Sequence, residues 1–412
     1  MEYGAGLRIC LLSYRSNPYC GGQGVYLKNL SLGLKELGHE VEIVSGPPDP
    51  MIDEGIRVFH MPGLDLYNPE YPFRTPGLRE LLEPVNLAEW LSVSTMGFPE
   101  PMTFGIRAYR FLRKRFGRYD IVHDNQSLSY GVRAIGKFVP TIATVHHPIT
   151  IDRDIAVRTA GSFLKKLKEM RWYSFIGMQK RVARKLLHII TVSMCARDDI
   201  SRDFKIPKER FTVIPNGINT DVFYRVPEIA REKDRVIVTN SADMPLKGLD
   251  YLLKAVARVS KKRSIRLVVV GSPKKDSSIV RLIEELGIGN VVKFTGRIDD
   301  KQFVLEYAKA CVAVVPSVYE GFGLPAGEAM ACGVPVISTR GGALPEVVGD
   351  AGILVEPEND KALARSITEV FDNPAMAGQL GNNGYKRIRE KFTWRKAAEK
   401  TVEVYRSVIA EG

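Results

Sequence analysis

Short apolar runs alternate with amphipathic helical patterns along this whole chain, and no other feature restricts its fold as much. Apolar runs of about five residues without internal polar positions are typical of parallel strands buried on both faces. Strands that alternate with helices form βαβ units, so we predict an α/β protein built on parallel sheets. The predicted strands of the first half are Arg8–Leu12, Val41–Ser45, Arg57–Met61, Ile121–His123, Thr141–His146 and Ile189–Val192. Those of the second half are Arg235–Thr239, Arg266–Val270, Val291–Phe294, Cys311–Val315 and Pro335–Ser338.

A chain of 412 residues is long enough for about two domains of roughly 100–200 residues each. We place the junction just before the segment that contains Asn216-Gly217, because this dipeptide is a turn signal. The predicted domains are residues 1–213 and 214–393, and residues 394–412 form a closing helix that crosses back to the first domain. Residues 62–105 are rich in proline and irregular, so we expect a long insertion that shapes a substrate cleft.

The segment from Ser317 to Pro335 is the most informative for function. Two glutamates, Glu320 and Glu328, flank a glycine loop that leads into a short predicted helix. Pro325 suits the first turn of this helix, and Gly333 suits its C-terminal end. The free amides and the dipole at the helix start make an anion site, and carboxylates beside it can accept hydrogen bonds from hydroxyl groups. A sugar attached to a nucleoside diphosphate offers both kinds of group.

Three further loops of the second half follow the carboxyl ends of predicted strands. They contain Lys247-Gly248, Gly271-Ser272-Pro273 and Thr295-Gly296-Arg297. Ligands of open α/β sheets bind at that edge, so we expect these loops and the Glu320 loop to converge on one crevice. Lys247, at a predicted helix start, could place a point charge on a diphosphate.

The first half carries weaker signals. The first predicted strand is followed neither by G-x-G-x-x-G nor by a Walker A loop, but by Gly21-Gly22-Gln23-Gly24 and a predicted helix, Val25–Leu37. The paired glycines either bring amides close to a phosphate or form a structural turn. His146 and His147 end a strand, and since neighbours on a strand point to opposite faces, we expect only one to be functional. We assign Asp152-Arg153-Asp154 to a surface loop rather than to a metal site.

Taken in order, these motifs resemble a family-4 retaining glycosyltransferase of the GT-B fold, in which two Rossmann-like domains face each other across a cleft. The resemblance covers nearly the full length. It rests on Gly21-Gly22, Leu37-Gly38-His39-Glu40-Val41, the His146 strand end, Asn216-Gly217-Ile218-Asn219, Lys247-Gly248, Phe294-Thr295-Gly296 and the Glu320/Glu328 block. It implies that the C-terminal domain binds a UDP- or GDP-sugar and the N-terminal domain binds the acceptor. It further implies hexose transfer with retention of anomeric configuration, without a metal or a cofactor.

The resemblance also implies roles for individual residues. Glu320 would bind hydroxyls of the donor sugar, Glu328 would bind the ribose hydroxyls, and His146 would approach the transferring sugar. Lys247 would stabilise the diphosphate leaving group, so His146, Glu320 and Lys247 are the implied catalytic residues. The implied substrate-binding residues are Gly21, Gly22, Ser241, Arg297, Ile298, Gly321, Phe322, Gly323, Leu324 and Glu328.

Ser241 departs from the family pattern, which commonly has an arginine six residues before the lysine that corresponds to Lys247. A neutral hydroxyl cannot replace a forked cation on a diphosphate. Two alternatives to a transferase therefore stay open. One is a catalytically impaired regulator that binds nucleotide sugars, and the other is a phosphorylase or epimerase on the same architecture.

The positive charge is concentrated in one quarter of the chain. Residues 101–200 contain 19 Lys/Arg and 7 Asp/Glu, and the difference of 12 equals the net charge of the whole chain, +12. This excess is either a solvated surface or a face that binds an anionic partner. Basic and aromatic residues within Ser162–Leu187 favour an anionic membrane interface and a lipid-linked or phosphorylated acceptor, and they argue against nucleic acid.

The termini and the cysteines bear on location. The N-terminus lacks a signal-peptide pattern, and no apolar run reaches the roughly 20 residues needed to span a bilayer. The five cysteines are scattered through strand and helix patterns, which is typical of free thiols in a reducing compartment. We expect a cytoplasmic protein, with the inner face of the membrane as a possible site of action.

Overall fold

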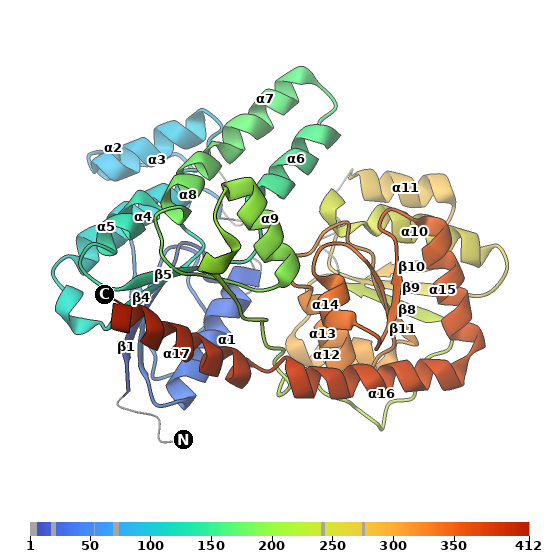
Figure 1. Ribbon diagram of the computed structural model, residues 1–412. Coiled ribbons are helices and arrows are strands. Elements are labelled where there is room, and N and C mark those ends of the chain that lie inside the picture. Colours follow the sequence, from blue (N-terminus) through green and yellow to red (C-terminus); the bar gives the residue numbers. More distant parts are fainter. Residues whose placement is uncertain are drawn as a thin grey trace. The chain divides into compact units, whose positions relative to one another are not determined.

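The computed structural model describes residues 6–17, 22–52, 54–68, 74–239, 244–273 and 277–411, so the candidate site residues Gly21 and Ser241 lie outside the described residues. The chain forms two compact units (Figure 1). Unit 1 contains Met1–Val192, Ala196–Pro215 and Trp394–Gly412, and unit 2 contains Ser193–Cys195 and Asn216–Thr393. The C-terminal segment thus belongs to the first unit.

Unit 1 is built on a parallel sheet with the order β3-β2-β1-β4-β5-β6-β7. Its strands are β1 (Arg8–Ser13), β2 (Glu40–Ser45), β3 (Arg57–His60), β4 (Ile121–Asn125), β5 (Thr141–Val145), β6 (Ile189–Thr191) and β7 (Phe211–Val213). The chain runs outward from β1 to β3 and then returns to β4 on the other side of β1. The sequence predicted six of these strands and missed β7, a three-residue strand at the sheet edge.

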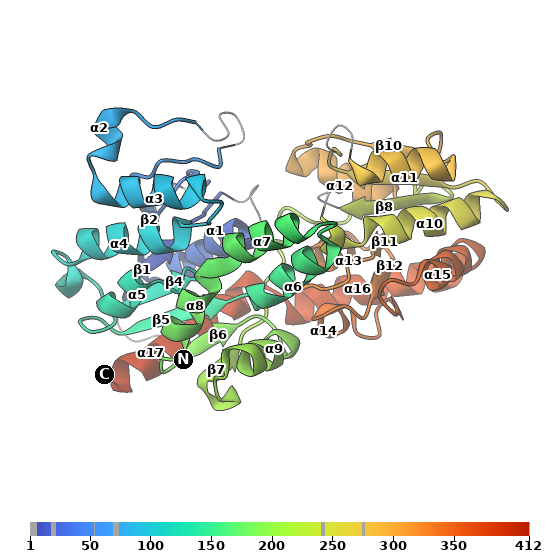
Figure 2. The same ribbon diagram turned by 90° about the horizontal axis from the view of Figure 1, so that it is seen from above.

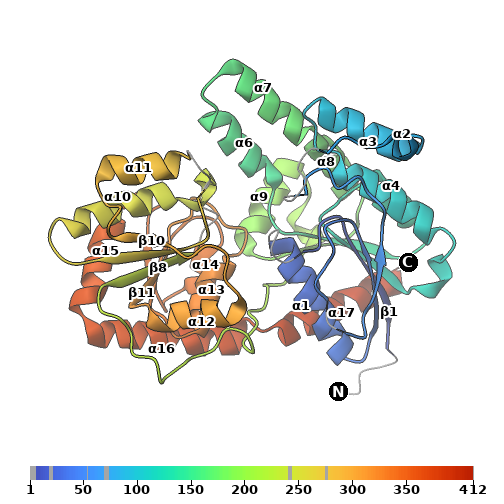
Figure 3. The same cartoon turned by 180° about the vertical axis from the view of Figure 1, so that it is seen from behind.

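Alternate side chains of β1 point to opposite faces of this sheet, and helices pack against the apolar side chains on both faces. Ile9 and Leu11 pack with α1 (Gly22–Glu36) and α17 (Trp394–Glu411), which lie side by side (Figures 1 and 3). Cys10 and Leu12 pack on the opposite face with α4 (Glu100–Leu112) and α5 (Tyr130–Ile135). Helix α1 begins at Gly22, three residues before the start predicted at Val25.

The outer helices of unit 1 correct two expectations. Residues 62–105 are not irregular throughout, since they contain α2 (Leu78–Leu81), α3 (Pro84–Ser94) and the start of α4. Asp152-Arg153-Asp154 is not a loop but lies within α6 (Ile149–Thr159). The basic segment is interrupted by a 3₁₀ turn at Tyr173–Phe175. That turn separates α7 (Phe163–Trp172) from α8 (Ile176–Ala183), and α9 (Met194–Phe204) follows β6.

Unit 2 contains a second parallel sheet, with the order β10-β9-β8-β11-β12-β13. Its strands are β8 (Arg235–Thr239), β9 (Arg266–Val270), β10 (Val292–Phe294), β11 (Val312–Val315), β12 (Val336–Thr339) and β13 (Ile353–Val355). Its helices are α10 (Leu249–Ser260), α11 (Ser278–Leu286), α12 (Asp300–Lys309), α13 (Leu324–Ala331), α14 (Leu344–Val348), α15 (Asp360–Asp372) and α16 (Pro374–Lys391). The two sheets confirm the α/β class with two Rossmann-like domains, and β13 is the one strand of this sheet that the sequence missed.

In unit 2 as well, alternate side chains of a strand face the same core. Val236 and Val238 of β8 pack against Leu252 and Val256 of α10, and α11 and α15 complete that layer. Four cysteines in the described residues, Cys10, Cys195, Cys311 and Cys332, are free thiols. Over the described stretches, no helix has the length and apolar character that a bilayer crossing requires.

Candidate functional site

The loops that follow β8 and β11 meet at the topological switch point of the unit 2 sheet. The chain proceeds outward from β8 to β10 and then returns to β11 beside β8, which is where open α/β sheets bind ligands. The Val318 amide donates to the Leu246 carbonyl at 2.8 Å. Gly248 has φ +65°, and a Cβ there would lie 2.1 Å from the Pro316 carbonyl oxygen. Only glycine permits this approach, so the two loops form one wall.

Lys247 and Glu320 come together across this wall. The Lys247 Nζ atom donates to Oε1 of Glu320 at 2.7 Å, and the Ser317 hydroxyl donates to the same oxygen at 2.8 Å. Both side chains are partly buried, with 26% of Lys247 and 11% of Glu320 exposed. The Glu320 carbonyl oxygen also accepts from the Ala343 amide at 2.9 Å. Glu320 is thus fixed by both its backbone and its side chain.

The start of α13 offers backbone amides. Gly323 precedes the helix with φ +104°, and Pro325 occupies its first turn as the sequence predicts. The Phe322 ring is buried and packs edge-on against Phe392 at 5.8 Å, so its side chain is turned into the protein interior. Within the described part of the chain, the amides of Phe322, Gly323 and Leu324 have no hydrogen-bond partner. Together with the helix dipole, they can bind an anionic group. Gly321 lies in the same loop, where its carbonyl accepts from the Ser193 hydroxyl at 2.8 Å.

Glu328 lies further along α13 and carries an unusual carboxyl group. Burial, with a smaller contribution from the carboxylates of Asp300 and Glu320, raises the pKa of Glu328 to about 7. No hydrogen-bond partner of this carboxyl group is found among the described residues. A partly buried carboxylate without donors is costly, and a ligand with a pair of hydroxyl groups would satisfy it.

Arg297 and Ile298 follow β10, and their loop is joined to the loop after β9. The Gly296 amide donates to the Gly271 carbonyl at 3.1 Å, and the two residues form an antiparallel bridge. Arg297 is exposed and Ile298 is partly buried. Both residues therefore lie at the carboxyl edge of the sheet, as do Lys247 and Glu320.

The switch point of unit 1, between β1 and β4, centres on Asn125. Its side-chain amide donates to the Gln23 carbonyl at 3.0 Å and to the Ser13 hydroxyl at 3.2 Å. Its Oδ1 atom lies 2.7 Å from His146 Nε2 and accepts a hydrogen bond from it. Nε2 therefore carries the proton, and Nδ1 is left as an acceptor. Burial, with smaller contributions from the nearby His147 and His123, lowers the pKa of His146 to about 3.

His146 and His147 have different surroundings. The Tyr26 ring lies 4.7 Å from the His146 ring in a T-shaped arrangement and restricts its orientation. His147 Nε2 lies 2.7 Å from Asp152 Oδ2, and both line a cavity of about 300 Å³ that Gly22 also lines. Gly22, the first residue of α1, therefore lines the same cavity as His147. Sequence reasoning missed Asn125 and Tyr26, although a polar run directly after a buried strand was a signal for Asn125.

The chain matches two family models that cover most of its length. Residues 20–222 match the description "Glycosyltransferase Family 4", and residues 223–387 match "Glycosyl transferases group 1". It is 45% identical over 409 residues to an MMP alpha-(1->4)-mannosyltransferase from Mycolicibacterium hassiacum, and the alignment covers 98% of this chain and 99% of that protein.

Solved structures support the fold. A sucrose-phosphate synthase from Thermosynechococcus elongatus is similar with a TM-score of 0.76 and 24% identity, and the match covers 98% of this chain and all of that chain. The Anabaena protein HepE, solved in complex with UDP and glucose, is similar with a TM-score of 0.70 and 18% identity over 97% of this chain and all of that chain.

The fold is therefore GT-B, and the protein is a glycosyltransferase. The chain belongs to the family-4 glycosyltransferases, the glycosyl transferases group 1.

Proposed function

We propose that the protein transfers mannose from a nucleoside-diphosphate mannose to a saccharide acceptor, with retention of anomeric configuration. The observation that carries the proposal is the pairing of Lys247 with Glu320 beside the start of α13. The choice of mannose rests on the 45% identical relative, which is named as an α-(1→4)-mannosyltransferase. A UDP- or GDP-linked donor fits the proposal equally well.

Unit 2 supplies groups that match each part of such a donor. Glu320 would accept hydrogen bonds from sugar hydroxyls, and Glu328 would accept them from the two ribose hydroxyls. The amides of Phe322, Gly323 and Leu324 would bind the diphosphate, and the loop of Arg297 and Ile298 would contact the base. This division of roles explains why two carboxylates lie near an anion site, since both bind hydroxyl groups.

Departure of the diphosphate would be assisted by Lys247. Its ammonium group has three donors, and the bond to Glu320 uses one of them, so two remain for phosphate oxygens. The leaving-group charge would be neutralised by this cation and by the α13 amides, and for that reason the proposed reaction needs no metal or cofactor. Catalysis would then consist mainly of positioning and of charge stabilisation.

His146 would contribute from unit 1. Because its ring is neutral and its Nε2–H is held by Asn125, the remaining Nδ1 can accept a hydrogen bond from a sugar hydroxyl. Transfer from an α-linked donor to an α-linked product is retention. We propose attack by the acceptor on the same face from which the diphosphate leaves.

A donor panel tests this proposal. The protein is incubated with UDP- and GDP-linked sugars and a mannose oligosaccharide, and released nucleotide and elongated product are measured. We expect release and elongation with one mannose donor. Tight nucleotide binding without release from any donor would instead indicate a regulator. Dependence on inorganic phosphate, or conversion of the donor without an acceptor, would indicate a phosphorylase or an epimerase.

A second proposal concerns membrane contact through α7. This helix has no buried residue, and Phe163 and Leu164 are 73% and 77% exposed. The same helix carries Lys165, Lys166 and Lys168, which follow these two residues along the chain. The Arg171 guanidinium at its end donates to Thr95 Oγ1, just beyond α3, at 3.0 Å. Figure 2 shows α3 and α7 among the outer helices of unit 1. Exposed apolar side chains between lysines match an anionic lipid surface, so we propose that α7 holds the enzyme at the inner face of the membrane and near a lipid-linked or phosphorylated acceptor.

A further inference from the structure

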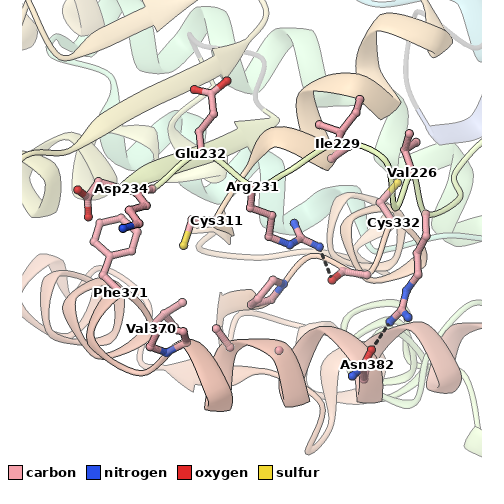
Figure 4. Close-up of a pocket in the computed structure, with 18 of the residues that line it drawn as sticks. Val226, Ile229, Arg231, Glu232, Asp234, Cys311, Cys332, Val370, Phe371 and Asn382 are labelled. Atoms are coloured by element: carbon pink, nitrogen blue, oxygen red, sulfur yellow. Dashed lines mark hydrogen bonds between the residues drawn. The ribbon is translucent and has the colours of Figure 1, made fainter.

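Unit 2 contains a cavity of about 820 Å³ that the proposed mechanism does not use (Figure 4). Asp234, Cys311 and Pro335 line it, and each directly precedes a strand of the sheet. The proposed donor loops of Lys247 and Glu320 follow the carboxyl ends of two of these strands, β8 and β11. The cavity therefore lies at the amino edge of the sheet, opposite the donor loops, and its volume is within the usual range of small-molecule sites, roughly 300–1,000 Å³.

Two arginines give this cavity its charge. Arg231 donates to the carbonyls of Ala310 and Gly333 at 2.6 and 2.7 Å. Arg225 donates to the Gly381 carbonyl at 3.1 Å and to Asn382 Oδ1 at 2.9 Å. All four acceptors are neutral, and no described carboxylate lies within ion-pair distance of either guanidinium. Each guanidinium has five N–H groups and uses two of them, so N–H groups remain for a further partner on both, although the Nε–H of Arg225 is buried.

The acids that line the cavity do not neutralise these arginines. Glu232 is bound by Arg235 at 2.8 Å and by Arg266 at 2.7 Å. Its carboxylate points away from Arg231 in Figure 4. Asp234 pairs with Arg263 at 3.1 Å. Arg225 and Arg231, together with the exposed Lys233 that also lines the cavity, therefore carry positive charge that these acids do not neutralise.

Both arginines lie against Gly333, whose carbonyl accepts from Arg231 and whose Cα faces the Arg225 guanidinium. Desolvation lowers the pKa of Arg231, and the like charge of Arg225 lowers it further. Arg231 nevertheless remains accessible through the mouth of the cavity, so its desolvation is partial and a ligand can reach it. Two adjacent cations without a counter-ion match a dianion better than a monoanion.

The other side of the cavity is apolar. Val370 and Phe371 of α15 line it, as does Ile229. We propose that this cavity binds a small phosphate monoester, whose dianion bonds to Arg225 and Arg231 and whose organic group packs against Val370 and Phe371. Phosphate is favoured over a carboxylate because it presents three oxygens and two charges to a pair of guanidinium forks.

Gly378 allows a direct test. It lines the cavity from α16, and a Cβ placed on it meets no atom within 4 Å. Gly378→Glu would add a negative charge to the cavity without a steric clash, and Gly378→Gln is the control of equal size. Both should preserve the helix, since glycine is the poorer helix former.

Binding of phenyl phosphate to the full chain is measured by calorimetry in the presence of saturating UDP or GDP, which excludes the donor site. We expect saturable binding, at least about tenfold weaker in Gly378→Glu and in Arg231→Gln, but within threefold of the parent in Gly378→Gln. Inorganic phosphate should bind more weakly than phenyl phosphate because it lacks the organic group. Absence of binding under these conditions, or equal binding by Gly378→Glu and Gly378→Gln, would overturn the proposal.

Discussion

The ammonium group of Lys247 lies 2.7 Å from Oε1 of Glu320. The carboxylate that we propose binds the donor sugar therefore positions the ammonium group that we propose binds the diphosphate. The two residues come from loops 73 positions apart that meet at the switch point of one sheet. Loss of either side chain should therefore disturb the position of the other as well as remove its own contact.

Glu320→Ala should abolish most transfer while the fold survives. Removal of one hydrogen-bonding group at a reacting centre typically costs about 10²–10³ in rate, and the loss of Lys247 positioning should add to it. We expect kcat/KM to fall by at least about 10²-fold, measured as product formed per nucleotide released. Glu284→Ala, at an exposed position of α11, is the control and should retain parent activity. Near-normal turnover of Glu320→Ala would contradict the site assignment.

Lys247→Met should lower kcat more than it raises the KM for the donor, because the cation is proposed to act on charge that develops in the transition state. Lys247→Arg should restore little, since a planar fork does not reproduce a compact point charge held by Glu320. Steady-state kinetics of both variants measure this split. Lys254→Met in α10 is the matched control, because its ammonium group lies 3.9 Å from Asp250 and away from the Glu320 loop. A pure KM effect in Lys247→Met would argue against a leaving-group role.

The parts that the sequence predicted correctly depend on local rules. Pro325 and Gly333 mark the two ends of α13 because proline suits a first helical turn and glycine suits a left-handed C-terminal position. The same rule explains the failure at 62–105: Pro84 and Pro101 were interpreted as loop residues, but each occupies the first turn of a helix. The two missed strands, β7 and β13, are three-residue strands that each lie at an edge of their sheet.

Partners distant in sequence could not be predicted. Tyr405 of α17 is hydrogen-bonded to His123 at 2.6 Å, and His123 and Tyr26 both bond to Thr144 beneath the His146 site. The Tyr405 contact exists only because α17 packs beside α1, which no local pattern specifies. The proposed roles of the site residues came from their order along the chain, and the hydrogen bonds around Asn125 came from the structure alone.

Glu328 should make donor binding dependent on pH. Its pKa of about 7 means that part of the population is protonated at neutral pH, whereas ribose hydroxyls are best accepted by the carboxylate. We expect the Kd for UDP or GDP to rise as pH falls below 7, approaching about tenfold per pH unit. Calorimetry between pH 5.5 and 8.5 measures this dependence. Glu328→Gln should bind more weakly at pH 8 and show a flat profile; an unchanged slope would exclude Glu328 as its source.

The same residue should have the opposite effect on stability. The pKa of Glu328 is raised in the folded state from 4.5 to about 7, so folding favours the protonated form. The contribution of Glu328 to the free energy of unfolding is therefore largest below pH 4.5. This contribution falls as pH rises from 4.5 to 7, by at most about 3 kcal/mol. Glu328→Gln should raise the free energy of unfolding at pH 8 but not at pH 5. Urea denaturation at both pH values measures the difference, and equal effects at the two values would contradict it.

Asn125 should act by positioning His146. Asn125→Ala removes the acceptor of the Nε2 proton, so kcat should fall about tenfold or more while nucleotide binding stays within twofold. Asn125→Asp retains an acceptor but adds a charge that raises the pKa of His146, and a new limb should appear in its pH–rate profile. At saturating donor, where the effect of Glu328 on binding does not enter, the parent enzyme should show no limb from His146 between pH 5 and 8, because its pKa of about 3 keeps His146 neutral. His188→Ala, which removes a partly buried partner of Glu411 outside the proposed site, is the control.

Membrane contact through α7 should depend on both its apolar and its basic side chains. Leu164→Glu removes an exposed apolar contact and adds a negative charge, so retention by liposomes that contain anionic lipid should fall at least tenfold at low salt. Sedimentation with liposomes at low and high salt measures this retention. Leu187→Glu is the matched control, because Leu187 is 67% exposed but lies outside α7. Failure of the parent protein to sediment with anionic liposomes would exclude the membrane contact, and equal losses in both variants would exclude α7 as its site.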